Sequence, residues 1–77
     1  MLVPDLMKMR RLRKERMTLL QMAEKLGYRS QNGYYYLESG IHKISAEMLA
    51  QVAAILEVPI QDLFIERGQA SDDRQLK

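Results

Sequence analysis

The side chains best suited to recognition chemistry are two adjacent amides, Gln31 and Asn32, which follow Ser30 and precede the three tyrosines Tyr34–Tyr36. A glutamine or asparagine amide can form two hydrogen bonds at once with the N6 and N7 edge of adenine in the major groove of DNA. A tyrosine can donate to a phosphate oxygen or pack on the methyl group of thymine. This combination indicates nucleic-acid recognition, with ordinary surface placement of the amides as the alternative.

The residues that catalysis or metal binding would require are sparse. The chain has one histidine, His42, and no cysteine, so neither a nucleophile–histidine–carboxylate set nor a thiolate metal site can be assembled. The four glycines form no phosphate-cradling loop, and 77 residues leave little room for a substrate pocket. We therefore expect a protein that is not an enzyme and that uses neither a cofactor nor a metal, with His42 contacting phosphate or solvent.

The net charge of +2 hides an uneven distribution. Residues 8–43 carry nine Lys and Arg against three Glu, whereas residues 44–77 carry six acids against three bases. One basic half is what a polyanionic partner would select, although a solvated basic helix face would look the same. No apolar run approaches the roughly 20 residues of a membrane span, and residues 1–5 lack a signal-peptide layout. We expect a cytoplasmic protein that does not contact the membrane.

Helical periodicity and capping residues define the elements that must position these side chains. Residues 5–16 form one amphipathic helix with Asp5 near its start. Thr18 and Gln21 match a capping box that begins a second helix, which Gly27 ends at residue 26. Ser30 caps a third helix over residues 31–39, closed by Gly40.

The third helix presents two kinds of surface. Tyr34 and Leu37 lie on one face and are expected in the core, whereas the amides and the other tyrosines point outwards. Gly33 costs the helix about 1 kcal/mol relative to alanine, which predicts that something approaches closely at this position.

The rest of the chain completes the predicted domain. Ser45 caps a fourth helix with an apolar stripe, and Pro59 suits the first turn of a fifth helix over residues 60–67, with Leu63 and Phe64 buried. Residues 68–77 are polar and predict a disordered tail. Because no strand pattern is visible, we predict an all-α fold, a compact bundle of five short helices over residues 1–67.

The order of these motifs resembles a known family. The stretches Thr18-x-x-x-Met22-Ala23-Glu24-Lys25-Leu26-Gly27, Leu37-Glu38-Ser39-Gly40 and the region from Ile44 to Phe64 are similar to the phage repressor and Cro-like (Xre-type) helix-turn-helix family. The resemblance covers about residues 6 to 65 and implies the lambda-repressor-like fold. Two departures are a turn before Ser30 that is one residue longer than usual, and Leu19 in place of a phosphate-binding glutamine.

The resemblance also implies roles for individual residues. The second helix would cross the DNA backbone and the third would enter the major groove. A buried ion pair would join Arg13 to Glu38. We expect base contacts from Gln31, Asn32, Tyr35 and Tyr36, and contacts to the DNA backbone from Thr18, Arg29, Ser30, Ser39, His42 and Lys43.

These expectations amount to a sequence-specific transcription regulator, a repressor that binds double-stranded DNA as a homodimer without a small-molecule effector. The candidates for the dimer surface are Leu63, Phe64, Ile65 and the N-terminal Leu2 and Val3. Two alternatives stay open: a protein-binding adaptor or antitoxin that uses the surface of Tyr34–Tyr36, and a DNA-recruiting part of a larger assembly.

Overall fold

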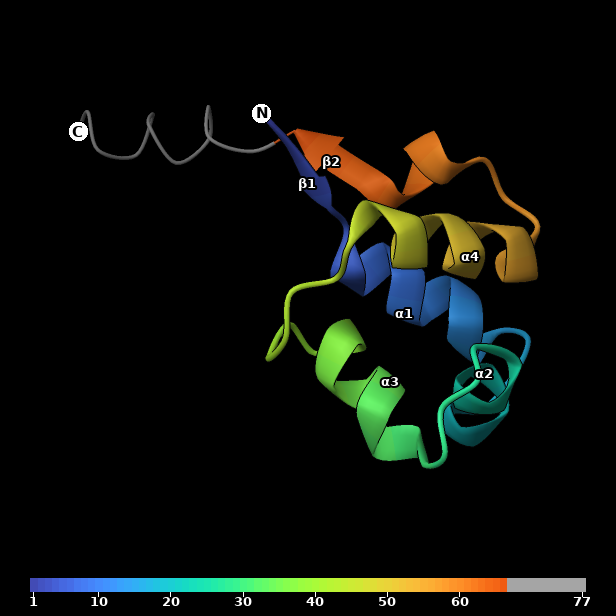
Figure 1. The fold of residues 1–77 in the computed structure, drawn as a ribbon. Helices are drawn as coiled ribbons and strands as arrows, with labels where there is room; N and C mark the ends of the chain where they lie inside the picture. Colours follow the sequence, from blue (N-terminus) through green and yellow to red (C-terminus); the bar gives the residue numbers. More distant parts are fainter. Residues whose placement is uncertain (67–77) are drawn as a thin grey trace.

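The computed structural model describes residues 1–66 (Figure 1). In chain order the elements are β1 (Leu2–Pro4), α1 (Leu6–Lys14), α2 (Leu19–Lys25), α3 (Gln31–Glu38), α4 (Ala46–Leu56), the 3-10 helix η1 (Ile60–Leu63) and β2 (Phe64–Glu66). The predicted tail of residues 68–77 lies outside the described residues. No helix within residues 1–66 has the length and apolar character needed to cross a membrane.

The first four helices begin and end at local signals that the sequence displays. Asp5 accepts a hydrogen bond from the Lys8 N–H at the start of α1 (3.1 Å), and Ser45 accepts one from the Met48 N–H at the start of α4 (3.0 Å). The predicted capping box of α2 is present in both directions, between Thr18 and Gln21. Ser30 occupies the N-cap position of α3, but its side chain makes no capping hydrogen bond.

The prediction of an all-α bundle of five helices is wrong at the C-terminal end. The expected fifth helix is only a four-residue 3-10 turn, and β2 then pairs antiparallel with β1, in the register Leu2↔Glu66, Val3↔Ile65 and Pro4↔Phe64. The Asp5 N–H donates to the Leu63 carbonyl beside this pair (2.7 Å). The pairing of β1 with β2 provides hydrogen bonds to backbone groups that a further helical turn would otherwise have satisfied.

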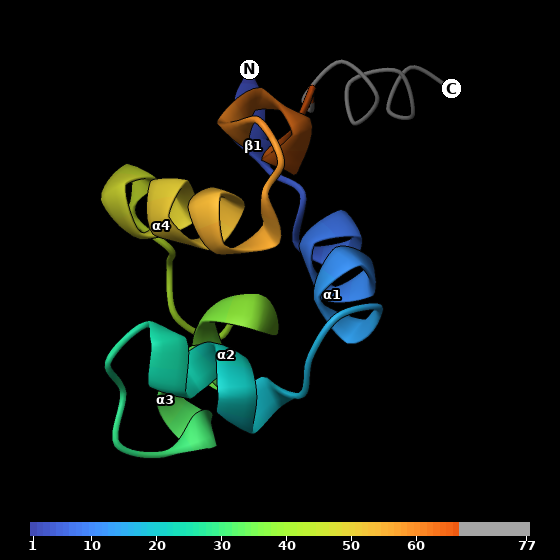
Figure 2. The ribbon, with the colours of Figure 1, turned by 90° about the vertical axis from the view of Figure 1, so that its right-hand side faces the viewer.

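One continuous core joins the helices. Its buried side chains come from every helix and from η1: Met9, Met22, Ala23, Tyr34, Leu37, Leu49, Val52, Ala53, Leu56 and Leu63. Figures 1 and 2 show α1 and α4 lying between the two-stranded sheet at one end and the α2–α3 pair at the other. The α2–α3 pair therefore projects from the body of the domain, with one side of each helix available to a partner.

Candidate nucleic-acid interface

A tight turn sets the direction in which α3 leaves α2. Gly27 adopts a left-handed conformation with φ +91°, which costs glycine little. The Gly27 N–H donates to the Glu24 carbonyl (3.1 Å) and the Tyr28 N–H to the Ala23 carbonyl (2.9 Å). This pair of hydrogen bonds is the Schellman arrangement, which satisfies carbonyls at the end of α2 and fixes the exit of the chain.

Tyr28 and Gly33 make the contact that holds the turn against α3. A Cβ atom at position 33 would lie 2.5 Å from Cδ1 of Tyr28, a distance that no side chain can occupy without displacing the ring. The close approach predicted at Gly33 is therefore made by the Tyr28 ring of the same chain. The ring fixes where the first turn of α3 lies.

The exposed side of α3 carries all four residues predicted to contact bases. Tyr34, Leu37 and Glu38 are buried, whereas Gln31, Asn32, Tyr35 and Tyr36 are exposed. At 3.6 residues per turn, these four exposed side chains follow one another over an arc of about 140°. The two amides lie on the first turn, the end of a recognition helix that reaches base edges in this class of motif.

An aromatic cluster of Tyr35, Tyr36 and His42 extends this exposed arc. The ring centroids of Tyr35 and Tyr36 lie 6.0 Å apart, and the His42 ring meets Tyr36 edge-on at 5.0 Å. The His42 N–H donates to the Tyr36 carbonyl (3.0 Å), and Ser39 Oγ donates to the same carbonyl (3.4 Å). The loop after α3 is thus folded back onto the helix, and the cluster has a defined shape before any partner binds.

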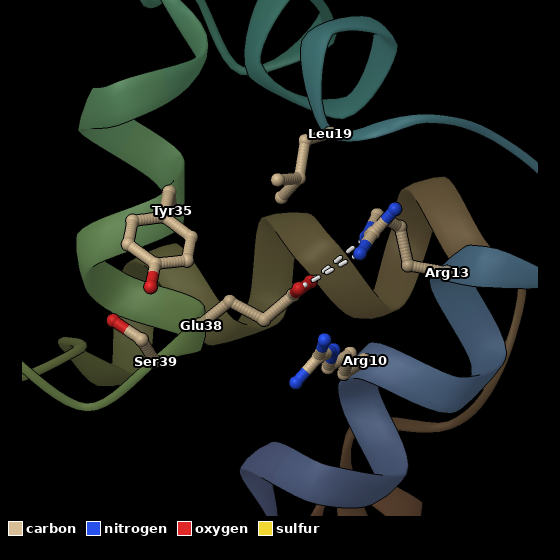
Figure 3. Close-up of a pocket in the computed structure, with 6 residues that line it drawn as sticks. All are labelled: Arg10, Arg13, Leu19, Tyr35, Glu38 and Ser39. Atoms are coloured by element: carbon tan, nitrogen blue, oxygen red, sulfur yellow. Dashed lines mark hydrogen bonds and ion pairs between the residues drawn. The ribbon is translucent and has the colours of Figure 1, made fainter.

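A buried ion pair anchors α3 to α1. Arg13 donates from Nε to Oε2 of Glu38 and from Nη2 to Oε1, each at 2.9 Å, a bidentate geometry (Figure 3). Arg13 Nη1 also donates to the Met17 carbonyl (3.2 Å), between α1 and α2. Both charged side chains are almost fully buried, so the pair links three segments at the centre of the molecule. It is the pair that the family resemblance implies.

The Tyr34 hydroxyl lies in the same interior. It is fully buried and makes no hydrogen bond of standard geometry within the described residues, although the Glu38 carboxylate lies close to it. Burial raises the pKa of Tyr34 above its ordinary value near 10, and the nearby Glu38 carboxylate acts in the same direction. Ionising this hydroxyl in the folded protein therefore requires a more alkaline pH than ionising a free tyrosine.

A cavity of about 120 Å³ lies between α1 and α3, and a shallower groove continues from it. The cavity is lined by Arg10, Arg13, Leu19, Tyr35, Glu38 and Ser39. Figure 3 shows Arg10 extending from α1 toward the space between Glu38 and Ser39. The groove is bordered by Arg10, Arg13, Lys14, Met17, Thr18, Leu19 and Gln31. The cavity of about 120 Å³ is large enough for a few water molecules but too small for a substrate, since small-molecule pockets start near 300 Å³.

Arg10 and Lys14 are the cationic residues that sequence reasoning missed. They stand on the α1 side of the groove that Thr18 and Gln31 also border, next to the predicted DNA-contacting residues. The available signal was their spacing, because positions 10 and 14 flank Arg13 at i−3 and i+1 and Arg13 points at α3. Both side chains are exposed, so their charges are open to a partner.

The residues predicted to contact the DNA backbone lie at several separate places on the surface. Thr18 lies in the groove beside Gln31, and its hydroxyl, which accepts from the Gln21 N–H (3.1 Å), keeps a proton to donate. Ser39 borders the cavity with Tyr35. His42 joins the aromatic cluster, whereas Lys43 borders a separate groove toward β1. Arg29 and Ser30 are exposed in the α2–α3 connection.

The family comparison decides what kind of unit this is. A family model described as Helix-turn-helix matches residues 7–63, most of the chain. The chain belongs to the Xre/Cro-like helix-turn-helix family. Neither a curated protein nor a solved structure matches it significantly.

Membership in the helix-turn-helix family assigns the protein to DNA-binding regulators and not to an enzyme family. The α2–α3 pair is the helix-turn-helix of this chain, with Gly27 in its turn and α3 as the second helix. Within residues 1–66 no group of three or more His, Cys, Asp or Glu side chains is placed to hold a metal ion.

Proposed function

We propose that the protein is a sequence-specific transcription repressor that places α3 in the major groove of a two-fold symmetric operator. The observation that carries the proposal is the exposed arc of α3, where Gln31, Asn32, Tyr35 and Tyr36 gather on a helix fixed at both ends. The Tyr28–Gly33 contact holds the start of this helix and the Arg13–Glu38 pair holds its end. A preorganised reading helix loses little entropy on binding.

Contacts to the sugar-phosphate backbone flank the reading helix in this proposal. Thr18 at the start of α2, with Arg10 and Lys14 across the groove, would meet one strand. Lys43, with His42 and Ser39, would meet the backbone on the far side of α3, and Arg29 and Ser30 would contact phosphates at its start. Each phosphate neutralised by a lysine or arginine contributes about 0.9 to the salt dependence of binding.

A homodimer supplies the specificity that one short helix lacks. Two copies related by a two-fold axis would read half-sites spaced by about 34 Å or a multiple of it. The prediction that Leu63 lies in the dimer surface is wrong, because this side chain is fully buried within one copy. Met7 and Ile65 are 83% and 47% exposed and border one groove beside the sheet together with Val3, and we assign this apolar surface to the dimer. Such a regulator would work in the cytoplasm.

The proposal is tested by selecting bound duplexes from a random DNA library and then measuring affinity for the selected site. Gln31→Ala should relax the preference at one base position at a cost of about 1–3 kcal/mol. Arg10→Ala should weaken all sequences alike and lower the salt slope. Gln61→Ala, on the exposed side of η1, is the control expected to change neither. No enrichment, or enrichment independent of Gln31, would contradict the proposal.

The aromatic cluster favours one other candidate, a protein-binding adaptor or antitoxin. Tyr35 and Tyr36 are 43% and 37% exposed, and aromatic side chains are enriched in protein–protein interfaces. An adaptor of this kind would show no specific affinity for duplex DNA at any salt concentration. The same selection and salt titration therefore separate it from a repressor.

A further inference from the structure

The exposed arc of α3 lacks the side chains that read guanine or cytosine. Guanine is read mainly by arginine or lysine at O6 and N7, and the segment from Gln31 to Glu38 contains neither residue. Cytosine is read by an acidic side chain that accepts from its N4 amino group. The one acid of α3, Glu38, is 6% exposed and engaged by Arg13 through both carboxylate oxygens. The helix therefore offers none of the side chains that preferentially read a G·C pair.

The arc holds instead the two chemistries that read an A·T pair. The exposed amides of Gln31 and Asn32 match the adjacent donor and acceptor of adenine at N6 and N7. The distinguishing group of thymine is its methyl group, which is read by apolar contact. The rings of Tyr35 and Tyr36 offer an apolar surface, one turn further along the helix at i+4 from each amide.

The rings are held in place to make such a contact. Tyr36 lies between Tyr35 and His42, and its backbone carbonyl accepts two hydrogen bonds from the following loop. A ring supported on both sides gives a fixed surface for a methyl group. Free rotation of an isolated tyrosine would have to be lost on binding.

We propose that α3 reads a half-site whose core is a run of A·T pairs, with adenine held by the amides of Gln31 and Asn32 and thymine methyl groups packed on the rings of Tyr35 and Tyr36. This rests on the proposed function and gives it a defined target. The basic residues next to α3 in the sequence, Arg29 before it and Lys43 after it, contact phosphate in this arrangement, as does the side chain of His42.

Replacing thymine by deoxyuridine in the selected site tests the proposal, because it removes one methyl group and keeps the base pair. Each contacted methyl should be worth about fourfold in affinity, the effect of burying one such group. The loss should persist in Tyr36→Phe, which keeps the ring, and shrink in Tyr36→Ala, which removes it. Circular dichroism spectra and thermal melts of both variants show whether they remain folded.

Two further substitutions extend the test to the amides and to guanine. Gln31→Ala should reduce discrimination for A·T over G·C at one position by about 5- to 150-fold. Arg29→Ala should leave the selected sequence unchanged.

The outcomes separate the two levels of the account. Three outcomes would overturn this inference and leave the proposed function standing. They are specific binding to a G·C core, equally tight binding of uracil and thymine sites, and loss of the sequence preference in Arg29→Ala. Absence of specific binding to any duplex would overturn both.

Discussion

A methyl group added at position 33 tests the contact that fixes α3 against the turn before it. The Cβ of Gly33→Ala would lie 2.5 Å from Cδ1 of Tyr28 and 3.0 Å from both Cγ and Cε1, so the whole edge of the ring obstructs it. Forcing such an overlap in a packed site costs about 1–3 kcal/mol. Alanine in place of glycine inside a helix contributes about 1 kcal/mol in the opposite direction. We expect Gly33→Ala to lower the free energy of unfolding by up to about 2 kcal/mol.

Removing the Tyr28 ring should reverse the effect of Gly33→Ala on the free energy of unfolding. In a Tyr28→Ala background the obstruction is gone, and Gly33→Ala should raise the free energy of unfolding by about 1 kcal/mol. The coupling energy of the cycle, about 1–3 kcal/mol, then measures the overlap itself. Urea unfolding of the four proteins, followed by circular dichroism, gives every value. Equal stabilisation by Gly33→Ala in both backgrounds would refute the role assigned to the Tyr28 ring.

Three other predictions concern the interior and the end of α4, and urea unfolding measures each. Glu38→Ala leaves the Arg13 guanidinium buried without its partner and should cost about 3–5 kcal/mol, whereas Glu24→Ala on the exposed side of α2 should stay within about 0.5 kcal/mol; equal effects would contradict the role of the pair. Tyr34→Phe removes an unpartnered buried hydroxyl and should stabilise by about 1 kcal/mol at pH 7. Since burial raises the pKa of Tyr34, only the unfolded chain ionises above pH 10, and the wild type should lose about a further 1.4 kcal/mol relative to Tyr34→Phe by pH 11; a parallel pH profile for the two proteins would argue against this. Glu57 closes α4 in the left-handed conformation (φ 60°), so Glu57→Gly should stabilise by about 0.5–1 kcal/mol, because the exposed Arg16–Glu57 pair that it removes contributes less than the strain that it relieves; a loss of stability would contradict this reasoning.

The helices α1 to α4 could be predicted because capping residues and glycines close to each boundary determine where the helix begins and ends. Thr18 and Gln21 satisfy each other within one turn, and Gly27 and Gly40 both adopt positive φ where the sequence places helix ends. The inward direction of Tyr34 follows from its spacing to Leu37. Such signals act over three or four residues, the range over which periodicity and capping are informative.

Features that join distant segments could not be predicted in the same way. The β1–β2 pair brings together residues at least sixty positions apart, and three-residue strands are too short to show alternation. Leu63 shows a related difficulty. The sequence alone does not tell whether an apolar residue of this kind packs in the core of its own chain or lies in an interface with a partner. Arg10 and Lys14 belong to the candidate interface because the Arg13–Glu38 pair turns that side of α1 toward α3. The periodicity of α1 alone does not show this orientation, and only the spacing of the two residues to Arg13, taken with the expected ion pair, indicates it.

Photochemical cross-linking tests the placement of α3 in the major groove most directly. Thymines of the selected site are replaced one at a time by 5-iododeoxyuridine, which carries iodine at the position of the methyl group. After irradiation, the cross-linked peptide is identified by mass spectrometry. We expect adducts at Tyr35 or Tyr36 at defined thymines of each half-site, and we expect them to be lost when those tyrosines are replaced by alanine. Adducts confined to α4 or to the sheet, with none on α3, would contradict it.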